Sequence, residues 1–157
     1  MKCVYSGSFD PPTLGHIDII RRAAAIFDEV NVTVFVNIAK RYEFSAQERV
    51  DMLRRATRDI GGVTVNSFDG LLVDYMRRTG ARVIVRGLRN MADFDSESSM
   101  AAINRQLLPG CETLFLPTSP EFMHISSSAV REVAHFGGDI SSMLPPEIVD
   151  EVRARFI

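Results

Sequence analysis

The sequence contains no tryptophan and few of the residues that build metal centres or disulfide frameworks, with two cysteines and three histidines in 157 residues. Cys3 and Cys111 form no C-x-x-C pair, and His16, His124 and His135 are equally scattered. A structural zinc site needs ligands at short, paired spacings, so none is predicted. We interpret the two cysteines as reduced thiols packed in the interior.

Neither sign of charge predominates, and no long hydrophobic run is present. Eighteen basic against 20 acidic residues give a net charge of −2, which argues against bulk attraction to nucleic acid or to an anionic membrane. The longest stretch without a charged residue, 30–39, is about half of a membrane-spanning helix, and the amino terminus shows no cleavable signal pattern. We expect a cytoplasmic protein without nucleic acid or membrane partners, in which any anion site is local.

Short runs rich in β-branched residues alternate with helical patterns along the chain. The predicted strands are residues 3–5, 31–36, 63–68, 83–85 and 113–116. Helical patterns follow the first four strands at residues 17–27, 46–58, 71–79 and 93–108, and residues 126–128 and 145–146 open two further helices. The best-defined start is the capping box of Ser45 and Glu48, which predicts a helix from Ala46.

This alternation predicts an α/β fold, in which a parallel sheet is covered by helices on both faces, because parallel strands need crossover connections. The length fits a single domain, residues 1–157, with the carboxyl-terminal helices packed on it as an appendage. Ligands of open parallel sheets bind beyond the carboxyl ends of the strands, so the loops after residues 5, 36, 68, 85 and 116 should hold the site.

The first of these loops, residues 6–16, runs directly into a helix. It is not a G-x-G-x-x-G dinucleotide fingerprint, because Gly7 and Gly15 lie eight residues apart with two prolines between them. The helix amino terminus that follows favours a phosphate group. Thr13 and His16 share one face of its first turn. The imidazole there either binds an anion or is merely a capping, half-buried side chain.

Two motifs carry a resemblance to a known superfamily. The segment GSFDPPTLGH at 7–16 resembles the (T/H)-x-G-H signature of nucleotidyltransferases, and ISSS at 125–128 resembles their second signature. Lys40, VRGLR at 85–89, ADF at 92–94 and GGD at 137–139 resemble the phosphopantetheine adenylyltransferase family over essentially the whole chain. The resemblance implies a five-stranded Rossmann-like fold, a homohexamer, and transfer of the adenylyl group of Mg-ATP to 4′-phosphopantetheine, giving dephospho-coenzyme A and pyrophosphate.

The same resemblance implies roles for individual residues. His16 matches the catalytic imidazole that binds the reacting α-phosphate and stabilises the transition state. The implied ATP contacts are Ser8, Phe9, His16, Gly87, Leu88, Arg89, Glu97, Phe122, Met123, His124, Ile125, Ser126, Ser127 and Ser128. The implied phosphopantetheine contacts are Ser8, Lys40, Leu72 and Arg86.

The chemistry that these residues suit is direct, in-line transfer without a covalent enzyme intermediate. The nucleophile is a phosphate monoester, mostly dianionic near neutral pH, so no general base is needed. Charge must instead be stabilised around the α-phosphorus by fixed donors and by Mg²⁺, the expected cofactor, for which no protein ligands are predicted. Lys40, Arg86, Arg89 and His16 supply donors from three loops. The two arginines directly after a buried-type strand favour anion binding over ordinary solvated cations, whereas Lys40 is assigned by the resemblance alone.

Two alternative functions remain open at this point. A nicotinate mononucleotide adenylyltransferase has a first signature close to G-x-F-D-P-P, which the Pro11-Pro12 step also fits. A non-catalytic nucleotide-binding sensor would keep the fold without turnover, but it has no need of a transition-state donor such as His16. The short chain and the VRGLR segment favour phosphopantetheine as the acceptor.

Overall fold

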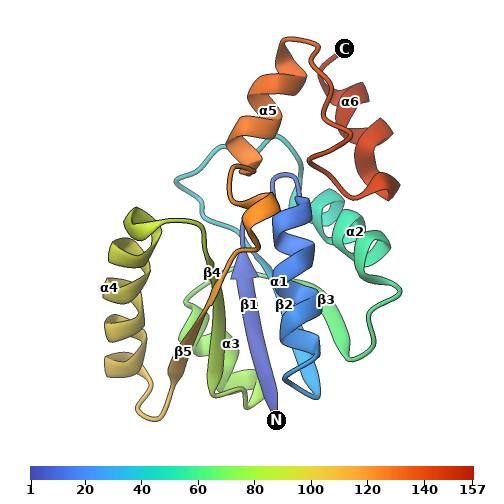
Figure 1. Cartoon of the computed structure of the whole chain (residues 1–157). Coiled ribbons are helices and arrows are strands. Elements are labelled where there is room, and N and C mark those ends of the chain that lie inside the picture. Colours follow the sequence, from blue (N-terminus) through green and yellow to red (C-terminus); the bar gives the residue numbers. More distant parts are fainter.

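The computed structural model describes all residues, 1–157, and is built around a five-stranded parallel sheet with strand order β3-β2-β1-β4-β5 (Figure 1). The strands are β1 (Lys2–Gly7), β2 (Glu29–Phe35), β3 (Val63–Phe68), β4 (Val83–Leu88) and β5 (Glu112–Pro117). All four neighbouring pairs are parallel. The predicted Rossmann-like α/β fold is therefore confirmed, and the strand order reverses between β1 and β4.

Six α-helices connect and extend these strands. They are α1 (Leu14–Ala24), α2 (Ala46–Thr57), α3 (Leu72–Thr79), α4 (Met91–Leu107), α5 (Ser127–His135) and α6 (Val149–Arg155), with short 3₁₀ turns η1 (Pro120–Phe122) and η2 (Pro146–Ile148). The Ser45 and Glu48 capping box is present, and α2 begins at Ala46 as predicted. The helix predicted at 17–27 instead spans Leu14–Ala24, because Thr13 caps it early.

Strands β1 and β4 are longer than their apolar runs. Their predicted ranges, 3–5 and 83–85, were wrong at the carboxyl ends, which extend to Gly7 and Leu88. Ladder pairing carries each strand beyond its β-branched residues, since Gly7 still pairs with Val34 and Gly87 with Leu116. The extension moves the start of the pocket-forming loops two or three residues along the chain.

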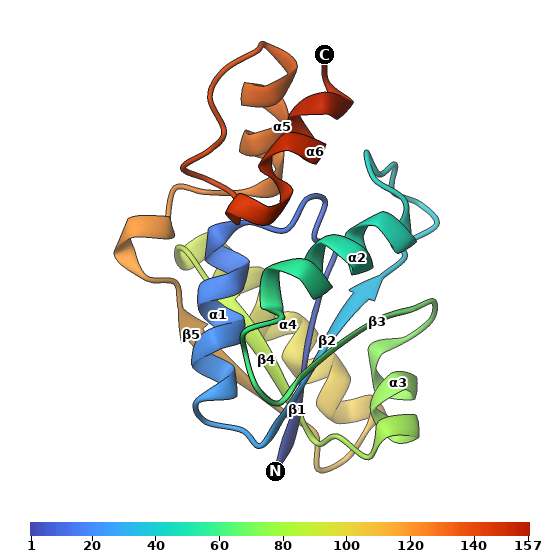
Figure 2. The same cartoon turned by 90° about the vertical axis from the view of Figure 1, so that its right-hand side faces the viewer.

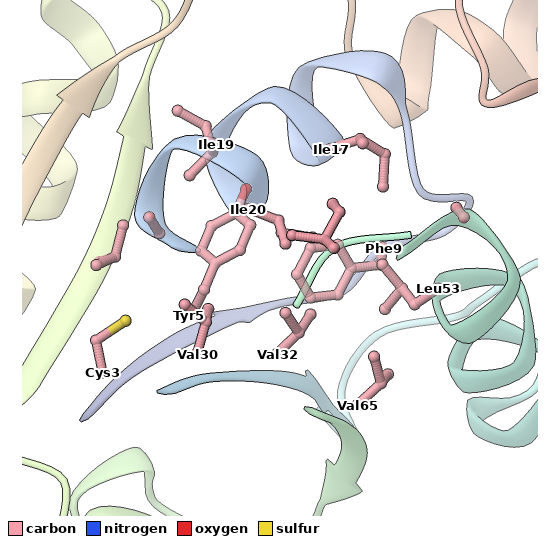
Figure 3. Close-up of a cluster of buried hydrophobic side chains, with 14 of the residues drawn as sticks. Cys3, Tyr5, Phe9, Ile17, Ile19, Ile20, Val30, Val32, Leu53 and Val65 are labelled. Atoms are coloured by element: carbon pink, nitrogen blue, oxygen red, sulfur yellow. The ribbon is translucent and has the colours of Figure 1, made fainter. Parts of the chain in front are cut away.

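The sheet is covered on both faces. The largest cluster of buried residues joins the strand side chains Tyr5, Val32 and Val85 to Ile20 of α1 and Leu53 of α2. Figure 3 shows Tyr5, Ile20, Phe9 and Leu53 converging in this cluster, and Figure 2 shows α1 and α2 in front of the sheet with α4 behind it. Because side chains alternate along a strand, the next residues face the other way.

A separate cluster seats the two carboxyl-terminal helices. Phe44, just before α2, and Met52, within it, pack with Val130 of α5, Val152 of α6 and Leu144 between these two helices. Figure 1 shows α5 and α6 above the carboxyl end of the sheet. The helices predicted at residues 126–128 and 145–146 therefore cap the edge at which ligands of such sheets bind. None of the helices is both long and apolar enough to cross a membrane.

Candidate active site

A cavity of about 300 Å³ opens at the carboxyl ends of β1 and β4, where the strand order reverses. Its walls come mainly from three segments: residues 6–16, from the end of β1 into α1; residues 86–93, from the end of β4 into α4; and residues 118–128, after β5. This reversal point is where open α/β sheets bind their ligands, because the flanking connections leave on opposite faces and part there. The cavity lies at the edge of the sheet where the sequence predicted a site.

Most of the predicted residues line this cavity. They are Ser8, Phe9, His16, Arg86, Gly87, Arg89, Glu97, Ile125, Ser126, Ser127 and Ser128. Leu72 lies beside it, in a smaller cavity of about 170 Å³ that also touches Arg86 and Glu97. Leu88 and Met123 line a neighbouring apolar recess instead.

Three predicted residues lie outside all of these hollows. Lys40 is exposed on the loop after β2 and lines none of the three cavities. His124 is exposed as well, and the half-buried Phe122 packs against the cluster that seats α5 and α6. Their implied roles in ligand binding stay predictions.

His16 both caps a helix and lines the cavity, so the two roles weighed from its spacing coexist. Its Nδ1 accepts a hydrogen bond from the Thr13 amide at 2.9 Å, while its own amide donates to the Thr13 hydroxyl at 3.3 Å. Desolvation, together with the nearby charges of Arg86 and Arg89, lowers the pKa of His16 to about 4. Because Nδ1 accepts, the neutral ring carries its proton on Nε2, which makes it a donor near neutral pH.

Phe9 holds the imidazole from one side. Its ring is 2% exposed and packs edge-on against the His16 ring, with 4.9 Å between ring centroids. Its backbone has φ of +50°, a left-handed conformation that is unfavourable for a bulky side chain. A Cβ added to Gly7 would approach this ring to 3.1 Å, so a glycine there gives the ring room. Burial of the ring offsets the backbone strain and fixes the loop at Ser8 and Phe9.

Arg86 and Glu97 form a paired wall between the two cavities. The guanidinium donates to both carboxylate oxygens, at 2.8 and 2.7 Å, and to the Ser6 carbonyl. Burial opposes the charged form, but the bonds to Glu97 outweigh it and raise the pKa of Arg86. Glu97, expected from the resemblance to contact ATP, has both oxygens engaged by Arg86 in the structure.

Asp93 orients the second arginine of the site, and it was missed from the sequence. Its carboxylate accepts from the Arg89 amide at 3.0 Å and from the Arg89 side chain at 3.3 Å. Asn90 caps α4 by accepting from the Asp93 amide at 2.9 Å. The spacing of Asn90 and Asp93 at a helix start was the available signal, because a capped first turn places its third residue near the preceding loop.

The serine-rich segment 126–128 forms the start of α5, and this start lies at the cavity. Ser126 caps the helix by accepting from the Ala129 amide at 3.1 Å, as predicted, and the Ser127 hydroxyl donates to the Pro11 carbonyl at 2.8 Å. The first turn of α5 therefore lines the same cavity as His16 and the two arginines. Free amides of a helix start and a local positive charge together suit a chain of phosphate groups.

The parallel sheet, the cavity at its carboxyl edge and the phosphate-suited donors around it define a class of nucleotide-handling enzyme. The family model described as cytidylyltransferase-like matches residues 4–133. A solved structure, described as a putative nicotinate-nucleotide adenylyltransferase from Vibrio parahaemolyticus, is similar with a TM-score of 0.68 over 99% of this chain and 96% of that chain. At 18% identity this likeness supports the fold alone. The class is that of the nucleotidyltransferases.

Much more similar relatives define the family. A phosphopantetheine adenylyltransferase of Clostridium beijerinckii is 49% identical, with 97% of this chain and 96% of the relative covered. A relative of the same name from Caldanaerobacter subterraneus is 48% identical, with 98% of this chain and 96% of the relative covered. Another, from Dictyoglomus thermophilum, is 46% identical, with 99% of this chain and 95% of the relative covered. The chain belongs to the phosphopantetheine adenylyltransferase family.

Proposed function

We propose that the protein transfers the adenylyl group of ATP to 4′-phosphopantetheine, with dephospho-coenzyme A and pyrophosphate as products. The observation that carries the proposal is the neutral His16, held by Thr13 so that its Nε2–H is free to donate beside Arg86 and Arg89. A neutral donor with a lowered pKa suits an α-phosphate oxygen on which charge develops during transfer.

The reaction needs donors rather than a base. The phosphate oxygen of phosphopantetheine attacks the α-phosphorus of ATP in line, and the bond to pyrophosphate breaks on the opposite side. His16 and Arg89 stabilise charge around the α-phosphorus, and the first turn of α5 holds the β- and γ-phosphates. Arg86 binds the phosphate of the acceptor, whose arm runs into the smaller cavity beside Leu72.

Mg²⁺ enters this scheme with ATP, as part of that substrate. No group of three or more histidine, cysteine, aspartate or glutamate side chains is arranged to hold a metal ion. The carboxylates nearest the cavity, Asp93 and Glu97, are engaged by Arg89 and Arg86. This donor set fits an ion that keeps its waters and binds mainly through substrate phosphates, where it neutralises charge.

The nicotinate mononucleotide alternative has weaker support. The relatives at 46–50% identity carry the phosphopantetheine name, whereas the structure described as a nicotinate-nucleotide enzyme is 18% identical. The decisive assay measures pyrophosphate release from ATP and Mg²⁺ with either 4′-phosphopantetheine or nicotinate mononucleotide. We expect release with the first acceptor only; release with the second alone contradicts the proposal, and binding without release supports the non-catalytic sensor.

We also propose that residues 1–157 act as one domain that assembles into a homohexamer. Only Asn104 is buried among the residues of α4, and this helix and β5 expose large apolar side chains. They are Met91, Phe94, Met100, Ile103, Leu107 and Leu114. Exposed apolar side chains of this size favour contact with another copy. Light scattering should give six times the 17.5 kDa chain mass, and a monomer at micromolar concentration contradicts this.

A further inference from the structure

Arg49 of α2 is the largest fully buried side chain, with 1% of its surface exposed. No carboxylate forms an ion pair with it. Its Nη1 donates to the Ser8 carbonyl at 2.7 Å, and its Nε donates to the Phe44 carbonyl at 3.0 Å. The guanidinium lies over the Tyr42 ring, with Cζ 4.0 Å from the ring centroid. The buried cation therefore donates its hydrogen bonds to backbone carbonyls of two loops.

The two loops are residues 8–13 after β1, the first loop, and residues 36–45 after β2, the second loop. The first carries Ser8 and Phe9, and the second carries Lys40. Asp10 of the first loop is 4% exposed, and its carboxylate accepts from the Glu43 and Phe44 amides of the second, both at 2.9 Å. Arg49 and Asp10 therefore join the loops in both directions.

Burying these charges has no simple benefit for packing. Burial lowers the pKa of Arg49, and the nearby Asp10 only partly offsets this. An apolar side chain of similar size would fill the same space without desolvating a cation. What the guanidinium adds is a fork of directed donors, which sets the orientation of the Ser8 carbonyl next to the strained backbone of Phe9.

We propose that Arg49 is a positioning residue for adenylyl transfer. Through the Ser8 carbonyl it holds the Phe9 ring against His16, and through the Phe44 carbonyl it holds the second loop, with Lys40, at a set distance from the first. Arg49 itself lines none of the three cavities. The proposal rests on the proposed function, since it assigns Ser8, His16 and Lys40 to one reaction centre.

The test compares Arg49→Met, which keeps the volume but loses every donor, with Arg49→Lys, which can reach only one carbonyl. Misplacing reacting groups by about 1 Å can cost about 10²-fold in rate. We expect Arg49→Met to lower kcat about 10- to 100-fold and to raise the KM for phosphopantetheine more than that for ATP. Arg49→Lys should fold more readily than Arg49→Met, and its kcat should lie between those of Arg49→Met and the unsubstituted chain.

Ile60→Ala is the matched control, because Ile60 follows the same helix, belongs to the main core cluster and lines none of the three cavities. It should lower the melting temperature while leaving turnover per folded molecule unchanged. If Ile60→Ala loses as much turnover as the Arg49 variants at an equal drop in melting temperature, the positioning role is wrong.

Hydrogen exchange provides a readout that does not need activity. In both Arg49 variants, peptides covering residues 8–13 and 36–45 should exchange faster than in the unsubstituted chain, with β3 unchanged. Unchanged exchange in these peptides, or uniformly faster exchange throughout, overturns the proposal. If the unsubstituted chain releases no pyrophosphate, the proposed function fails, and the exchange pattern still decides whether Arg49 holds the two loops.

Discussion

The two faces of the same sheet differ in chemistry, although they are made by alternate residues of the same strands. Toward α1 and α2, the side chains of Val30, Val32 and Val34 are fully buried in one apolar cluster. Toward α3 and α4, Ser6, Thr33 and Asn66 lie side by side in register on three strands, and Arg86 of β4 donates to the Ser6 carbonyl. The first face is apolar throughout, whereas the second combines a smaller apolar cluster around Val4 and Ile84 with a row of polar groups that leads to the edge of the site.

The largest expected effect comes from opening the apolar face. Ile20→Ala removes a fully buried side chain of α1, and deletions of this kind cost about 2–5 kcal/mol of unfolding free energy. Turnover per folded molecule should stay near normal, because Ile20 lies away from the cavity. Chemical denaturation and a steady-state assay on one preparation check this, with the exposed Arg21→Ala as the control. A loss of turnover without a loss of stability would break the comparison.

On the polar face, Arg86→Ala should weaken the binding of one substrate more than it lowers the stability of the fold. Because the variant loses a charge-assisted contact to the acceptor phosphate, we expect the KM for phosphopantetheine to rise about 10- to 100-fold, with a smaller change in the KM for ATP. Arg82→Ala is the matched control, since this arginine lies before β4, away from the cavity, and bonds only the Pro109 carbonyl. Equal increases in both Michaelis constants would count against the assigned role.

A substitution of Thr33 on the polar face should raise the stability of the protein. Its hydroxyl is the one fully buried side-chain polar atom that lacks a hydrogen-bond partner. Thr33→Val keeps the shape and removes that unsatisfied group, so we expect stability to rise by about 1 kcal/mol with both Michaelis constants unchanged. Denaturant unfolding measures the gain. A loss of stability would mean that the hydroxyl has a role on this face that its contacts do not reveal.

The last of these predictions concerns pH. Because the folded pKa of His16, about 4, lies below the usual value of 6.5, the unfolded chain binds a proton that the folded chain does not. The contribution of His16 is therefore complete above pH 6.5 and is lost progressively as the pH falls toward 4. Unfolding curves at pH 7 and pH 5 should show a smaller drop for His16→Asn than for the unsubstituted chain; an equal drop would contradict the lowered pKa.

The features predictable from sequence are those written in local patterns. The capping box of Ser45 and Glu48, the helix end at residue 79 and the cap at Ser126 all appear where the spacing put them. The five strands follow β-branched runs, and the cavity lies at the carboxyl edge that a parallel sheet dictates. His16 could be placed on the correct face of a helix because its partner, Thr13, is only three residues away.

The parts that could not be predicted depend on contacts between distant segments. Arg49 reaches Ser8 across 41 residues, and Asp10 reaches Phe44 across 34, so no local spacing signals either pair. The pairing of Arg86 with Glu97 was hidden for the same reason, since a strand end and a helix face meet only in the folded chain. Lys40 was assigned from resemblance alone, and its role in binding stays a prediction.

The central claim is that His16 acts in the transition state as well as capping α1. The direct test is His16→Ala, with kcat, ATP affinity and melting temperature measured on one preparation. Loss of a preorganised donor predicts a fall of about 10²- to 10³-fold in kcat, with ATP affinity changed by no more than several-fold. Loss of the cap adds about 1 kcal/mol of destabilisation. Near-normal turnover in a variant that merely melts at a lower temperature would contradict the account.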